Sequence, residues 1–518
     1  MRRRELLRST AGVGALALSF PSFRVGGSDT ATPAAFDADA ITSGSTPTWL
    51  VKYDTDRKGS LTEWLDGHED RIQRRDLDGL DMMVIEAPRS EIGLGQLDLL
   101  LGNGLQSRSY VKWIDVNLRM QYADPITSLE SDDVWEHDLS AWQSFRVGSS
   151  TGSLADAGVA FDEDTEETTM ADAKWLTNSE TIIDDGSGLT VAIIDSGCNT
   201  GGGIFEDADG NTRILDASED FVAGETVAED GLDAVADPNG HGTWVASAIA
   251  ANPPDSADVE HMGYLPGADL LICRALDSKG SGSTEAIAAA IDHAAANGAD
   301  LLCMSLGSVT WSAALDDALA SAKDQGMAAF VAAGNDRFGS TWVNSPADSE
   351  HALAVGATNV AVDDRQNVKP AYFHNVGDDP GTTDLSGGES AGAMVDITAP
   401  GMAMTTLTPR TTGSVIERTL SGTSMATPCV VGCAGLVLAS NPDLEPDELH
   451  DRLTTYARPV ENVAVVEAEH GLVDAQAAIE KTEREDTQGD VMNDEATSRD
   501  AAYRALSSAS GGFFTGLF

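Results

Sequence analysis

Short apolar runs alternate with helix-period stretches along the second half of the chain. From residue 188 onward, each apolar run reads as a strand buried on both faces, and each intervening stretch repeats its apolar positions at helical spacing. The expected strands lie at 189–194, 270–273, 301–304, 328–333 and 352–355, and the expected helices at 241–252, 283–297, 312–325 and 424–440. Strands that alternate with helices predict an α/β fold, in which a parallel sheet is flanked by helices.

A smaller unit precedes this region, at residues 48–124. It combines expected strands at 49–53, 82–87 and 110–114 with expected helices at 60–72 and 90–102. This mixture predicts a small α+β domain. Residues 125–172 separate the two units. They are acidic, rich in Ser and Thr and nearly free of periodicity, which is typical of a connector.

Both ends of the chain read as segments outside the folded units. Residues 1–26 open on Arg2-Arg3-Arg4 and continue into an apolar run that is shorter than the ~20 residues of a spanning helix. This pattern predicts a twin-arginine type signal peptide and export from the cell; the alternative is a basic, partly helical N-terminal arm. Residues 27–47 are predicted to be a spacer, and residues 481–518 a C-terminal tail.

The charge balance narrows the classes of partner. The 518 residues include 84 acidic and 32 basic side chains, a formal net charge of −52, which excludes nucleic acid and anionic membrane surfaces as partners. Hydrophobic residues make up 42% of the chain, which is enough for a large core and argues against disorder. An acidic, lysine-poor surface suits concentrated salt, where self-repulsion is screened. We interpret it as the mark of a halophile; an ordinary acidic secreted protein is the alternative.

The chain has five cysteines, at 198, 273, 303, 429 and 433. So few cysteines in an exported protein do not make a disulfide scaffold. We expect most of them to be small buried thiols, and one disulfide bridge remains open.

Three segments carry residue types that suit catalysis. A buried-type strand ends at Asp195, at the edge where α/β sheets place their ligand sites. Two glycines flank His241 at the start of an Ala-rich helix, and Ser424 lies near the N-terminus of the last long helix, where free N–H groups favour a developing oxyanion. Taken singly, each residue is also compatible with a turn, helix-start or cap role.

Together the three residues make chemical sense. A serine hydroxyl becomes nucleophilic when a neighbouring base removes its proton, histidine has a pKa that suits that task, and a buried carboxylate fixes the imidazole tautomer. The order Asp…His…Ser is that of subtilisin and differs from the orders in α/β-hydrolases and chymotrypsin. An esterase or lipase would also need G-x-S-x-G, whereas this chain has Gly422-x-Ser424-x-Ala426.

The chain resembles the subtilisin-like serine proteases, the subtilase family, from about residue 173 to 480. The segments VAIIDSG (191–197), GHGTWVA (240–246) and SGTSMATP (421–428) are similar to the three catalytic signatures of that family, and VAAGND (331–336) is similar to its oxyanion motif. These motifs, together with the acidic composition, make the chain look like a halolysin from a halophilic archaeon.

The resemblance implies a secreted serine endopeptidase and a role for each matching residue. Asp195 would orient the imidazole, His241 would act as general base and acid, Ser424 would be the nucleophile, and Asn335 would donate its amide to the oxyanion. Ser305, Leu306 and Gly307 would pair with an extended polypeptide substrate by β-augmentation. Ser305 to Gly307, together with Ala332, Ala333 and Gly334, would form the walls of the primary specificity pocket.

The resemblance also implies partners and cofactors. Residues 48–124 are similar, more weakly, to the propeptide that inhibits such proteases intramolecularly and aids their folding, and a monomer is expected. No cofactor is required for the chemistry. A structural calcium ion is compatible with the alternating oxygen ligands of 207–211, although that loop lacks the remaining ligands of a full site and a solvated acidic loop is the alternative. The rival function is a catalytically silent binding module on the same fold.

Overall fold

The computed structural model describes residues 46–93, 104–122, 167–254, 256–308, 310–335, 337, 343–361, 368–377, 393–459 and 467–482. The predicted signal peptide at 1–26, most of the spacer at 27–47 and of the connector at 125–172, and the tail beyond residue 482 lie outside these residues.

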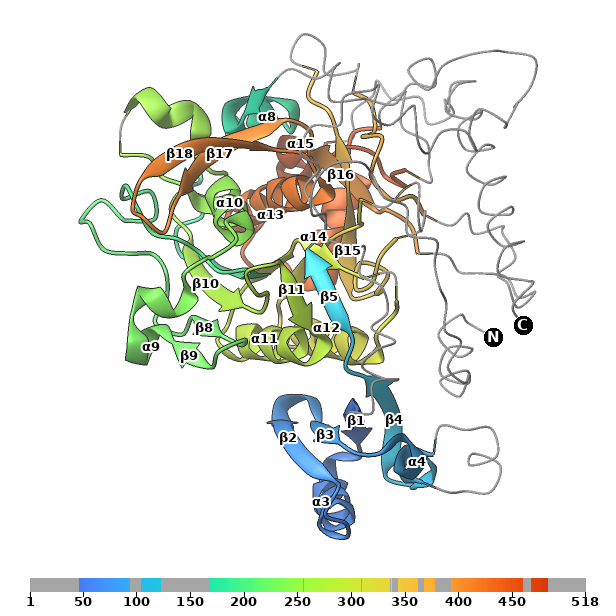
Figure 1. Cartoon of the computed structure of the whole chain (residues 1–518). Helices are drawn as coiled ribbons and strands as arrows, with labels where there is room; N and C mark the ends of the chain where they lie inside the picture. The colour runs from blue at the N-terminus through green and yellow to red at the C-terminus, as the bar shows by residue number, and fades with distance from the viewer. Residues whose placement is uncertain are drawn as a thin grey trace, which may run out of the picture.

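An eight-stranded sheet forms the centre of the larger unit (Figure 1). Its order is β16-β15-β14-β12-β7-β10-β8-β9, and every neighbouring pair is parallel except β8 and β9. The strands are β7 Thr190–Asp195, β8 Glu219–Asp220, β9 Glu225–Thr226, β10 Asp269–Arg274, β12 Leu301–Met304, β14 Ala328–Ala332, β15 Ala352–Thr358 and β16 Ile397–Pro400. The predicted α/β fold with a mostly parallel sheet is therefore confirmed.

Helices cover both faces of this sheet. Successive side chains of a strand point to opposite faces, so each buried strand presents apolar side chains to the helices on both sides. Val191 and Ile193 of β7 pack in the core cluster that contains residues of α10 (His241–Ala250) and α13 (Thr423–Ser440). Ala192 and Ile194 pack on the opposite face, in the cluster that contains residues of α11 (Thr284–Ala296) and α12 (Ala313–Asp324). All four helices were predicted from their apolar periodicity.

The smaller unit contains a four-stranded antiparallel sheet in the order β2-β3-β1-β4. Its elements are β1 Thr48–Tyr53, α3 Lys58–Asp66, β2 Ile72–Leu77, β3 Met82–Glu86, α4 Arg89–Ile92 and β4 Val111–Val116. The helix expected at 60–72 ends at Asp66, and its last expected residue, Ile72, begins an edge strand. The first three residues of β2 are exposed, so this strand lacks the buried alternation that identifies strands in a sequence.

Strand β5 (Arg119–Tyr122) connects the two units. It follows β4 and lies between β11 (Ser281–Ser283) and β13 (Leu306–Gly307), both of which belong to the larger unit. Figure 1 shows β5 running from the smaller unit to a position alongside β11. The smaller unit thus places part of its own chain within the larger one.

Further elements complete the larger unit. Strand β6 (Thr168–Thr169) pairs with the hairpin of β17 (Met404–Pro409) and β18 (Val415–Leu420). The remaining helices are α8 Met170–Leu176, α9 Val227–Asp230, α14 Pro446–Thr455 and α15 Ala475–Glu480. Helix α8 begins ahead of residue 173, where the resemblance begins, because Thr169 and Asp172 cap its N-terminus reciprocally.

All five cysteines lie in the described part of the chain and are buried free thiols. Helix α13 is the one described helix whose length and apolar composition would suffice to cross a membrane, and 89% of its apolar window is buried inside the fold. That burial is typical of the central helix of a globular core.

Candidate active site

The first candidate residue, Asp195, is the last residue of the central strand β7. Its neighbours in the sheet are β10 and β12, and its side chain is only 1% exposed. The backbone N–H of Ser196 donates to Asp195 Oδ1 at 2.7 Å. The carboxylate therefore sits at the carboxyl edge of the sheet, where α/β folds bind ligands.

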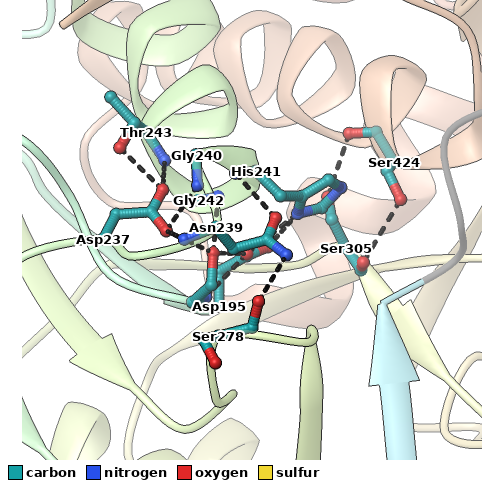
Figure 2. Close-up of polar contacts among 11 residues, drawn as sticks. Asp195, Asp237, Asn239, Gly240, His241, Gly242, Thr243, Ser278, Ser305 and Ser424 are labelled. Atoms are coloured by element: carbon teal, nitrogen blue, oxygen red, sulfur yellow. Dashed lines mark hydrogen bonds and ion pairs between the residues drawn. The ribbon is translucent and has the colours of Figure 1, made fainter. Parts of the chain in front are cut away.

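The second candidate, His241, begins helix α10 and contacts Asp195 directly. Its Nδ1 lies 2.8 Å from Asp195 Oδ1 and 3.0 Å from Oδ2 (Figure 2). A carboxylate at Nδ1 fixes the tautomer in which Nδ1 carries the proton and Nε2 can accept one. Figure 2 shows the imidazole between Asp195 and Ser424. This is the arrangement of a general base.

The glycines around His241 have a steric reason. Gly240 has a φ of 89°, a left-handed conformation that glycine adopts without strain, and it ends the loop before α10. A Cβ at Gly242 would overlap the carbonyl oxygen of Gly197 and lie 3.1 Å from the Asp195 Cβ. The helix can therefore approach the end of β7 closely enough for His241 to reach Asp195.

The third candidate, Ser424, is the second residue of α13 and is buried in the full chain. Its hydroxyl donates to the carbonyl of Ser305 at 3.2 Å, and the hydroxyl of Ser305 donates back to the carbonyl of Ser424 at 3.0 Å. The N-terminal turn of a helix presents N–H groups and a positive dipole end, which favour negative charge on a nearby oxygen.

Asn335 is bound to the residue that precedes Ser424. Its side-chain Oδ1 accepts hydrogen bonds from the backbone N–H and the hydroxyl of Thr423, both at 2.9 Å. The same hydroxyl accepts from the backbone N–H of Gly334 at 3.2 Å. Because the oxygen end of the amide is directed at Thr423, its NH₂ end, which carries the donors, is directed away from Thr423.

The expected substrate strand is paired with β5. Leu306 and Gly307 lie opposite Tyr122 and Gln121 in antiparallel register, and Gln121 also lies opposite Ser281 on the other side. Ser305, the residue before β13, carries the carbonyl that Ser424 contacts. An extended segment in the position of β5 is therefore paired on both edges, and one of its partner strands follows the residue that Ser424 contacts.

Three of the residues expected to line the specificity pocket lie at the end of strand β14 and directly after it. Ala332 is its last residue, Ala333 donates its N–H to the carbonyl of Val355 at 2.9 Å, and Gly334 has a φ of 107°. A Cβ at Gly334 would lie 2.5 Å from the side-chain nitrogen of Asn344. The structure thus brings these residues next to Asn335 and Thr423.

Sequence reasoning missed Asp237, which organises the approach of His241 to Asp195. Its buried carboxylate accepts five hydrogen bonds at 2.7–2.9 Å, and the donors are Ser196 Oγ, Asn239 N, Gly240 N, Thr243 N and Thr243 Oγ1. Figure 2 shows these contacts from strand end to helix start. The signal in the sequence was an Asp shortly before a Gly-His helix start, a pattern typical of turns and caps.

In the loop at 207–211, the carboxylate oxygens of Asp207 accept hydrogen bonds from other residues of the same loop. Asp207 accepts from the backbone N–H groups of Asp209 and Asn211 and from the Asn211 amide, at 2.8–2.9 Å, and these bonds, the Asn211 amide first, lower the pKa of Asp207. Within the described ranges no group of three or more His, Cys, Asp or Glu side chains could hold a metal ion.

Comparisons with known proteins agree in one family. A protein-family model described as the subtilase family (Peptidase_S8) matches residues 186–492. M-protease of Shouchella clausii (strain KSM-K16) is 35% identical over 293 residues, which are 57% of this chain and 64% of that protein. Subtilisin Savinase of Lederbergia lenta is 34% identical over 57% of this chain and 91% of that protein.

One solved structure extends the likeness in fold. The crystal structure of fervidolysin from Fervidobacterium pennivorans, a keratinolytic enzyme related to subtilisin, matches with a TM-score of 0.58. The match covers 85% of this chain and 62% of that one, at 18% sequence identity. At that identity the match supports the fold alone.

Proposed function

Because the chain belongs to the subtilase family of subtilisin-like serine proteases, we propose that it is an endopeptidase that hydrolyses peptide bonds of polypeptide substrates. The observation that carries this proposal is the Asp195–His241 hydrogen bond at 2.8 Å beside a serine at a helix N-terminus. Asn335, whose side-chain oxygen accepts a hydrogen bond from the backbone N–H of Thr423, supplies the oxyanion donor that acyl transfer needs in addition.

In the proposed mechanism, Ser424 Oγ attacks the scissile carbonyl while His241 Nε2 accepts its proton. Asp195 keeps the imidazole in the required tautomer and stabilises the imidazolium that forms. The oxyanion is stabilised by the Asn335 amide and the backbone N–H of Ser424. His241 then protonates the leaving amine, and water hydrolyses the Ser424 acyl-enzyme by the reverse proton path.

Residues 48–124 act in this proposal as a propeptide that inhibits the enzyme intramolecularly. Support comes from β5, which takes the edge positions of both β11 and β13 that a substrate would need. Other contacts fix the smaller unit to helix α12 and to its N-cap residue, Ser312. Asp115 accepts from the hydroxyl of Ser312 at 2.9 Å, and Trp113 Nε1 donates to Asp317 at 2.9 Å. Substrates would reach Ser424 only after this unit is released.

The remaining parts of the proposal concern the setting of the enzyme. From residues 1–26 we infer export by the twin-arginine pathway. From the net charge of −52 we infer a halolysin-like enzyme of a halophilic archaeon, which acts in concentrated salt. We expect it to act as a monomer. The proposed chemistry requires no cofactor, and any calcium ion would be structural.

Hydrolysis of casein in high salt tests the proposal. The purified chain and its Ser424→Ala variant are compared by the appearance of acid-soluble peptides. We expect hydrolysis by the first and none above background by the second. If neither the unmodified chain nor the Ser424→Ala variant hydrolyses casein after the smaller unit has been released, the silent binding module is favoured.

A further inference from the structure

A buried ion pair lies two residues beyond Asn335. The guanidinium of Arg337 contacts the carboxylate of Glu467, and the two side chains are 1% and 0% exposed. Burying two charges is costly unless they are paired and hydrogen-bonded. The proposed mechanism gives neither residue a chemical step, so their burial beside the active site needs another reason.

Arg337 is also tied to a segment that flanks Asn335 on its other side. Its Nη1 donates to the carbonyl of Ala371 at 2.9 Å, and its backbone N–H donates to the carbonyl of Phe373 at 3.2 Å. From the same segment, the backbone N–H of Asn375 donates to the carbonyl of Gly334 at 2.9 Å. The residues on both sides of Asn335 are therefore held by 371–375.

Glu467 is in turn held by the central sheet. Two residues later, the N–H of Glu469 donates to the carbonyl of Val395 at 2.8 Å, and the N–H of His470 donates to that of Asp396 at 3.1 Å. Val395 and Asp396 directly precede β16, a strand of the eight-stranded sheet. The Glu467 carboxylate is thus a fixed point to which the guanidinium is attached.

We propose that Arg337 and Glu467 are positioning residues for the oxyanion hole, an inference that rests on the proposed function. Thr423 fixes the oxygen end of the Asn335 amide, and the ion pair fixes the backbone from which that side chain extends. Both anchors are needed, because an amide on a displaced backbone cannot keep its NH₂ end within hydrogen-bonding distance of a developing oxyanion. A misplacement of about 1 Å can cost about 10²-fold in rate.

The variants Arg337→Met and Asn335→Ala, singly and combined, test this role. Turnover of a peptide substrate is measured per active site, and active sites are counted by fluorophosphonate labelling of Ser424. We expect Arg337→Met to lower kcat about 10-fold or more and to change KM by less than about 2-fold. The loss of kcat should be smaller than the ~10²–10³-fold that removal of an oxyanion donor costs, a magnitude known from a subtilisin. In the Asn335→Ala background, Arg337→Met should change kcat by less than about 2-fold, since the group on which it acts is gone.

Arg213→Met is the matched control. This buried arginine donates to the carbonyls of Ala268, Ala250 and Ile204, none of which belongs to the segments that hold Asn335. Its loss should lower the melting temperature and leave kcat per active site unchanged. If Arg337→Met does not fold, the double variant with Glu467→Met removes both charges and keeps apolar volume in the core.

The outcomes separate this inference from the proposed function. An unchanged kcat in the folded Arg337 variant or the double variant overturns the inference, as does an equal loss of kcat with and without Asn335. A wild-type chain that is labelled at Ser424 but turns over no peptide would instead count against the proposed function.

Discussion

The substitution Asp237→Asn tests how the structure holds His241, the proposed general base. The carboxylate is 1% exposed, and its two oxygens divide five hydrogen bonds between the end of β7 and the start of α10. An amide of the same size offers one acceptor oxygen. At least one set of donors must therefore face an NH₂ group.

The least damaging orientation keeps an oxygen toward the three donors of Oδ1 and turns the NH₂ toward Thr243. The Thr243 hydroxyl can rotate and accept from this NH₂, but the backbone N–H of Thr243 loses its acceptor. A buried donor without a partner costs about 1–3 kcal/mol, and the remaining bonds weaken because the charge is gone. We expect the free energy of unfolding to fall by about 2–4 kcal/mol and kcat to fall about 10-fold or more as His241 shifts.

Stability is measured by urea unfolding in the Ser424→Ala background, which prevents self-digestion, and kcat is measured with Ser424 present. Asp207→Asn is the control, because Asp207 also accepts several hydrogen bonds but only within an exposed loop. It should leave both quantities unchanged. A loss below about 0.5 kcal/mol for Asp237→Asn, the usual range for surface substitutions, together with an unchanged kcat would show that Asp237 does not hold His241 in place.

Three further predictions concern Gly242, His450 and Asp115. Gly242→Ala should abolish both labelling of Ser424 and the native circular dichroism spectrum, because its Cβ would overlap the Gly197 carbonyl; survival of both would contradict the steric argument. Burial lowers the pKa of His450 from 6.5 to about 4, so the folded state loses stability as pH falls from about 6.5 to about 4. The free energy of unfolding should fall by about 3 kcal/mol over this pH range. Urea unfolding of the His450→Leu variant should not show this fall. Burial raises the pKa of Asp115, so release of residues 48–124 should become easier as pH rises above its ordinary value of 3.8. The lag before activity appears should then shorten with rising pH in the native chain, and an equally steep dependence in Asp115→Asn would count against this origin.

The central sheet was predictable because its strands are buried on both faces. β12, β14 and β15 are buried along their whole length, so they appear in the sequence as continuous apolar runs. The edge strand β2 and the hairpin strand β18 carry mixed polar side chains, and their pairing depends on neighbours that the local pattern does not reveal.

The candidate site divides in the same way. Asp195, His241, Ser424 and Asn335 were selected because each lies in a short local motif, and the structure brings the first two into direct contact. Arg337 and Glu467 are separated by 130 residues and carry no local signal. Such a pair becomes visible only when packing has brought its two segments together.

The most direct test of the account is the site and rate of covalent labelling by a serine-directed fluorophosphonate, measured by peptide mass mapping. We expect one adduct, on Ser424, and a rate that falls by about 10²-fold or more in His241→Ala, because the general base is lost. Labelling at another residue, or an equal rate without His241, would contradict the assignment of a serine nucleophile activated by this histidine.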